Sequence, residues 1–271
     1  MNKRDLSMIA LVFFLSRCFF NLYTFTNLYQ FLFCALLIFI VILVMKKINI
    51  DLSKHTILKW IYIILLLPIF VLILYNASNF ININYFRYHN YFTTTLSILT
   101  ISYIIGKDKI KTISSISEVF LFIFIIIAFL ISISLISLIK VENYKGFLTF
   151  SKMSIRLLPF LLLVPLFYIR KNNITLGYLF GSFSSLFDLF LLIGSLGIKL
   201  PHTYTYPGIS ILKTITFFNF VNHLDKLFSF IYLFEYTIAL ALILNIILNL
   251  VWKNSPNEKG LDRNSRHTKS A

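Results

Sequence analysis

The sequence has few of the residues on which catalytic and metal sites depend. Its two cysteines, Cys18 and Cys34, both lie in apolar runs without the spacing of metal ligands. They predict packed thiols, and neither a disulfide nor a zinc site. The motifs H-E-x-x-H, C-x-x-C and G-x-S-x-G and a phosphate-binding glycine loop are all missing. We therefore expect no cofactor, no metal site and no enzymatic activity.

Charged side chains are also scarce. They make up 13% of the 271 residues, whereas hydrophobic residues make up 58%, and the mean hydropathy is +0.84. A soluble domain is about one quarter charged. So much apolar surface cannot be hidden in one core of this size, so lipid must be the solvent. The composition therefore predicts an all-α polytopic membrane protein.

Basic residues outnumber acidic ones by 25 to 10, a balance that in a soluble protein would suggest nucleic-acid binding. Here the lysines and arginines lie mostly in short loops and in the C-terminal tail. The positive-inside rule places them there in membrane proteins. We therefore expect lipid as the partner of this surface, and no nucleic acid.

Eight apolar runs are candidate membrane spans, since a spanning helix needs about 20 mainly apolar residues. They cover roughly 6–23, 27–45, 57–75, 91–106, 118–139, 155–169, 174–197 and 227–251. The fourth and sixth are short, so counts of seven and nine stay open. With the N-terminus inside, sixteen lysines and arginines fall inside and eight outside, which predicts cytoplasmic N- and C-termini. The expected organisation is a transmembrane domain over 1–252 and a disordered cytoplasmic tail over 253–271.

Three charged residues, Arg17, Asp188 and Glu235, fall within the predicted spans. Each costs about 2.5–3.5 kcal/mol at the centre of a helix. Such residues face the bundle interior and pair, so we expect Arg17 to pair with Asp188 or Glu235. Two interpretations stay open: a site for a polar ligand or ion, and a structural salt bridge. One acid would remain unpaired, and it is the better candidate for a ligand site.

The predicted sixth span contains two prolines, Pro159 and Pro165. Each removes a backbone donor, so we expect this span to be kinked or partly unwound. Transporters bind substrates at such discontinuous helices, although a packing kink is the simpler interpretation. In the next span, Gly177 and Gly181 have the G-x-x-x-G spacing that allows another helix to approach closely.

The stretch 197–239 contains the only long connection between predicted spans and ends inside the last of them, and its sequence resembles a known family. It contains Tyr206-Pro207, then Ile211-Leu212-Lys213, then FNFVNHLDKLFSFIYLFEYTIAL. This resembles the segment after the seventh helix of the GerAB-type spore germination permeases. Upstream, YIIGKDKIKTISSISEVF is similar to a family segment through Gly106 and Glu118, and VPLFYIRKNNITLGYLFGSF through Pro165, Arg170-Lys171 and the two glycines. The resemblance covers roughly 100–245.

This resemblance implies the amino acid–polyamine–organocation transporter fold. It also implies the ligand-sensing integral subunit of a germinant receptor, in the inner membrane of a spore beside A- and C-type subunits. Its ligand would be a small nutrient such as an amino acid. The charges and prolines within the spans supply the candidate ligand-binding residues, which are Arg17, Pro159, Pro165, Asp188 and Glu235. The chain departs from the family in stopping after the equivalent of the eighth of ten helices, in having no glycine break in its first helix, and in Asp188.

Three other functions stay open from the sequence. A secondary transporter of the same fold could be proton-coupled through Glu235 or Asp188. A membrane-embedded glycan polymerase or transferase could use His202, Arg156 and Lys213 in the outer loops. A purely structural assembly subunit would need none of these residues.

Overall fold

The computed structural model describes most of the chain outside its long connection and its C-terminal end. The described residues are 3–22, 25, 27–47, 56–86, 91–148, 157–169, 174–197 and 224–252. Every regular element within these ranges is helical, which confirms the predicted all-α class for them. Residues 198–223 of the long connection and the expected tail at 253–271 lie outside the described residues.

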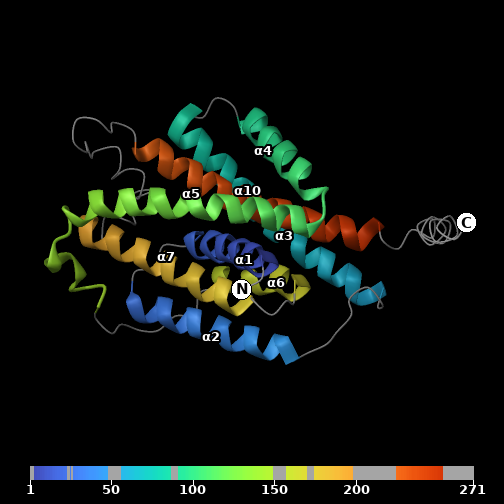
Figure 1. The fold of residues 1–271 in the computed structure, drawn as a ribbon, viewed down its shortest axis with the longest axis horizontal. Helices are drawn as coiled ribbons and strands as arrows, with labels where there is room; N and C mark the ends of the chain where they lie inside the picture. Colours follow the sequence, from blue (N-terminus) through green and yellow to red (C-terminus); the bar gives the residue numbers. More distant parts are fainter. Residues whose placement is uncertain are drawn as a thin grey trace, which may run out of the picture.

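Figure 1 shows the described helices side by side in one bundle. The α-helices are α1 (Lys3–Asn21), α2 (Leu28–Lys47), α3 (Thr56–Ile81), α4 (Tyr91–Gly106), α5 (Ile110–Ile136), α6 (Leu163–Ile169), α7 (Ile174–Leu196) and α10 (Leu224–Trp252). The shorter elements are the π-helix η1 (Asn82–Phe86) and the 3₁₀ helices η2 (Val141–Tyr144) and η3 (Leu158–Leu162).

Five helices within the described ranges are long and apolar enough to cross a membrane. They are Leu28–Lys47, Thr56–Phe86, Ile110–Ile136, Ile174–Leu196 and Asp225–Val251. The chain is therefore a multi-pass helical membrane protein. Shorter apolar helices stand at the other three predicted places, Leu6–Asn21, Tyr91–Gly106 and Leu158–Ile169. The count of eight spans and the orientation with both termini inside stay predictions.

The third, fifth and sixth helices differ from the sequence-based boundaries. The third, predicted to end at Tyr75, continues to Ile81. The fifth begins at Ile110, eight residues before its predicted start, because an α-helix can extend beyond the apolar run that hydropathy detects. The expected break in the sixth takes the form of η3 followed directly by α6. Pro159 is the second residue of η3, in its first turn, where an N–H would have no intrahelical partner. Pro165 is the third residue of α6.

The centre of the bundle is α1. All of its residues from Ser7 to Phe20 are buried, so no face of this helix is left for lipid or water. It packs against α5, α7, α10 and η3, and Figure 1 shows it (dark blue) inside the bundle. The outer helices instead expose large apolar side chains, such as Leu36 of α2, Ile64 of α3 and Ile126 of α5. These exposed faces are the surface that a bilayer would cover.

The contact between α1 and α7 depends on the G-x-x-x-G pair. A Cβ atom added at Gly181 would lie 2.7 Å from the carbonyl oxygen of Phe13, and one at Gly177 would lie 2.6 Å from that of Ile9. Both distances are far inside van der Waals contact with rigid backbone. The predicted close approach is therefore confirmed, and its partner is α1.

We predict that Gly181→Leu separates α7 from α1 and destabilises the protein by about 1–3 kcal/mol or more, because neither backbone can give way. The matched control is Phe183→Leu, at a position of α7 that is 68% exposed. Thermal unfolding in detergent, followed by size-exclusion chromatography, measures both variants. A Gly181→Leu protein as stable as the control would contradict this account of the contact.

The two ends of α7 tie other segments to opposite ends of the bundle. At its start, Thr175 accepts a hydrogen bond from the Lys46 ammonium at the end of α2, at 3.1 Å. Near its other end, the Gly194 carbonyl accepts from the Lys140 amide, after α5, at 2.9 Å. Since α7 is long enough to cross a membrane, the end of α2 and the segment after α5 should face opposite sides.

We predict that Glu142→Cys reacts with a membrane-impermeant maleimide added to intact cells and that Lys47→Cys does not. Both native side chains are exposed. The native thiols Cys18 and Cys34 are buried, so we expect little background labelling. The reversed pattern would place the end of α2 outside and contradict the predicted orientation. Labelling of both variants from the outside would contradict the crossing of α7.

Candidate functional site: a buried ion cluster

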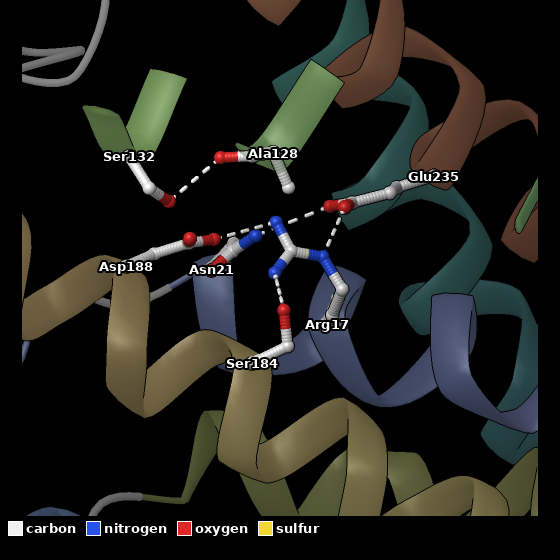
Figure 2. A network of polar contacts seen from close by, with 7 residues as sticks. All are labelled: Arg17, Asn21, Ala128, Ser132, Ser184, Asp188 and Glu235. Carbon is white, nitrogen blue, oxygen red and sulfur yellow. Dashed lines mark hydrogen bonds and ion pairs between the residues drawn. The ribbon is translucent and has the colours of Figure 1, made fainter. Parts of the chain in front are cut away.

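Arg17, Asp188 and Glu235 meet inside the bundle, each from a different helix. The Arg17 Nε–H donates to Glu235 Oε1 at 2.5 Å, and Nη2 lies 2.7 Å from Asp188 Oδ2. Figure 2 shows the guanidinium of α1 between the carboxylate of α7 on one side and that of α10 on the other. We call these three residues the ion cluster.

Two neutral side chains also hydrogen-bond to the ion cluster. Nη1 of Arg17 donates to Ser184 Oγ at 2.6 Å, and Asn21 Nδ2 donates to Glu235 Oε2 at 3.1 Å. Both oxygens of Glu235 are therefore engaged. Three nitrogens of one guanidinium serve three acceptors, which a single lysine ammonium could not match in this planar arrangement.

Aromatic rings cover the guanidinium of Arg17. Its Cζ atom lies 4.4 Å from the ring centroid of Phe124 in α5 and 5.9 Å from that of Phe13 in α1. A desolvated cation over an aromatic face gains about 2 kcal/mol. The rings also keep water and lipid from this face of Arg17, which strengthens its electrostatic contacts.

The local sequence explains why these groups meet. Residues four apart lie on one face of a helix, so Arg17 and Asn21 share a face of α1, and Ser184 and Asp188 share a face of α7. Gly181 lies one turn before Ser184 on that face and brings α7 against α1. The close approach of the two backbones is what places Ser184 and Asp188 within reach of the guanidinium.

The ion cluster is deeply buried at two of its three members. The side chains of Arg17 and Glu235 are 2% and 1% exposed, whereas that of Asp188 is 32% exposed. One guanidinium faces two carboxylates, so the ionised cluster carries a net charge of −1. No other cation in the described ranges lies within ion-pair distance of either acid. Isolated charges in hydrocarbon are costly, so pairing is required for these residues to stay ionised.

The expected pairing of Arg17 is confirmed, but the expectation that one acid stays unpaired is wrong. The planar fork of the guanidinium reaches both carboxylates at once. Pro159 and Pro165 lie in η3 and α6 and are not part of this hydrogen-bonded cluster. The sequence analysis missed Asn21 and Ser184, although their spacing of four from Arg17 and Asp188 could have indicated them.

Several residues named in the sequence analysis cannot be related to the ion cluster. Arg156, His202 and Lys213 lie outside the described residues. Within the described part of the chain, no group of three or more His, Cys, Asp or Glu side chains is placed to hold a metal ion. Cys18 and Cys34 are buried free thiols there.

Comparison of the chain with protein-family models, with curated proteins and with solved structures finds no match in any of the three. The helices and the ion cluster show a multi-pass α-helical membrane protein whose central helix carries an arginine paired with two carboxylates.

We predict that Arg17→Met destabilises the protein by about 3–5 kcal/mol, because it leaves two carboxylates buried together without a cation. The triple variant Arg17→Met, Asp188→Asn, Glu235→Gln should regain most of this loss, since no charge is then left unpaired. Thermal unfolding in detergent compares the two proteins. If Arg17→Met alone were as stable as the parent, the ion cluster would not hold the bundle together.

Proposed function

We propose that this chain is the integral membrane subunit of a spore germinant receptor, acting beside A- and C-type subunits, and that it senses a small nutrient such as an amino acid. The observation that carries the proposal is the ion cluster. Ionised groups inside a membrane domain are costly and mark ligand or ion sites. Here they join three separate helices, so a ligand that binds them would act on all three.

The residues that carry the resemblance to the GerAB-type permeases support this proposal. Gly177 and Gly181 lie in the contact of α7 with α1. Gly106 lies at the end of α4 against α10, where an added Cβ would be 2.6 Å from the carbonyl oxygen of Ala241. Glycines that the resemblance selects on sequence alone thus stand at the close contacts of the helices that bear the ion cluster.

A signalling step follows from the chemistry of the ion cluster. An amino acid carries an ammonium and a carboxylate, the same groups that pair inside the protein. The ammonium or carboxylate of a bound ligand can therefore replace one partner of an internal ion pair at little electrostatic cost. Any such exchange changes how α7 or α10 is held against α1, and neighbouring subunits would detect the shift between the two arrangements.

A secondary transporter is the second candidate, favoured by the excess of one carboxylate over the single guanidinium. An additional acid at membrane depth can carry a proton or another cation across with the substrate. Uptake of labelled amino acids by proteoliposomes of the purified chain separates transport from sensing. Ligand-dependent germination without uptake would favour the receptor.

We predict that spores carrying Glu235→Gln lose their response to the nutrient that the parent chain senses. The variant keeps one cation and one anion in the ion cluster, so it should fold and reach the membrane. The nutrient is found first, by comparing a deletion strain with its parent over a panel of amino acids. Loss of optical density of the spore suspension reports germination, and an immunoblot of the membrane fraction reports expression.

The matched control is Glu142→Gln, the same change at an exposed acid of η2. It should germinate like the parent. A normal response of the Glu235→Gln spores would exclude the ion cluster as the sensing site. A deletion strain that germinates normally with every nutrient would exclude the receptor function itself.

A further inference from the structure

Among contacts within the described ranges, one acceptor of the ion cluster stays open. Both oxygens of Glu235 accept hydrogen bonds, from Arg17 and from Asn21. Asp188 meets Arg17 through Oδ2, and its other oxygen, Oδ1, has no hydrogen-bond partner in the described ranges. Asp188 is also the one member with substantial exposure, at 32%. Asp188 is therefore the member of the ion cluster with the most exposed side chain, and Oδ1 is its oxygen without a hydrogen bond in the described ranges.

The charge of the ion cluster selects what can bind at that oxygen. Two carboxylates and one guanidinium leave one negative charge without a partner. A ligand without net charge leaves this imbalance, and one with an additional carboxylate increases it. A ligand with a net charge of +1 removes this imbalance, and the attraction is strengthened because Arg17 and Glu235 are shielded from water.

We propose that the ion cluster binds a cationic ligand through a primary ammonium group that donates to Asp188 Oδ1, so that the preferred nutrient is a basic amino acid or an aliphatic diamine. This inference deepens the proposed sensing function and rests on it. It assigns Asp188 as the binding residue, Arg17 as its positioning partner, and net charge as the basis of specificity.

Helix α5 supplies a second acceptor for the ammonium. α5 packs against α7, and Figure 2 shows the Ser132 hydroxyl of α5 on the same side of the ion cluster as the Asp188 carboxylate. Ser132 donates its own proton to the Ala128 carbonyl at 2.6 Å, so its oxygen faces any further group only as an acceptor. An ammonium has three N–H donors and can use Asp188 and Ser132 together.

Binding to the purified full chain in lipid nanodiscs tests the proposal, with lysine, cadaverine and alanine as probes in calorimetry. Lysine and cadaverine should bind about tenfold or more tightly than alanine, since only the cations neutralise the net negative charge of the ion cluster. Cadaverine lacks a carboxylate, so its binding isolates the ammonium contact. Ser132→Ala should weaken the binding of lysine and of cadaverine. It should not change the order of affinity among the three ligands.

Asp188→Asn removes the open carboxylate oxygen and leaves the balanced pair of Arg17 and Glu235, so it should fold and lose about tenfold or more in affinity for both cations. Asp188→Glu should restore the preference for cations. The matched control is Asp225→Asn, at an acid of α10 outside the ion cluster, which should bind as the parent does.

Failure of this inference is distinguishable from failure of the proposed function. If alanine binds as tightly as lysine and Asp188→Asn changes nothing, while Glu235→Gln spores still lose their response, only the inference is wrong. Binding of neither cation also overturns it. If alanine binds more tightly as the pH falls while lysine does not bind, a proton and not an ammonium neutralises the ion cluster, which equally overturns it.

Discussion

The structure depends on the need to satisfy an arginine where no water is available to do so. Arg17 lies in a helix that is buried all round, so its charge and its N–H groups must find partners within the protein. Those partners come from α7 and α10, and each contact ties its helix to α1. One side chain thus fixes the relative positions of three helices. Apolar packing alone would leave these helices free to slide and rotate against one another.

Polar pairing and close packing support each other along α1. Hydrocarbon provides little force to drive helices together, so contacts in membranes depend on small residues and on interhelical hydrogen bonds. On α7 these follow in sequence: Gly177 and Gly181 bring the backbones together, and Ser184 and Asp188 then reach Arg17. A bulkier residue at either glycine would lengthen the ion pair between Arg17 and Asp188. A neutral residue at position 17 would remove the ion pair that holds α7 against α1.

The helices and the charged members of the ion cluster could be predicted from sequence, because hydropathy detects apolar runs and a charge within a run is conspicuous. Helix ends could not. Hydropathy marks where lipid begins, so the polar first two turns of α5 were placed outside the helix. The engagement of both acids by Arg17, and the parts played by Asn21 and Ser184, depend on how helices are rotated about their axes, which no local pattern specifies.

The burial of α1 has a consequence for how the protein is made. Arg17 and Glu235 are separated by 218 residues, so the ribosome synthesises α10 long after α1 has emerged. At about 5–20 residues per second, the arginine waits roughly 10–40 s for its second carboxylate. During that interval the unpaired arginine costs about 2.5–3.5 kcal/mol at membrane depth. We therefore expect the innermost helix to be made early and to reach its final packing late.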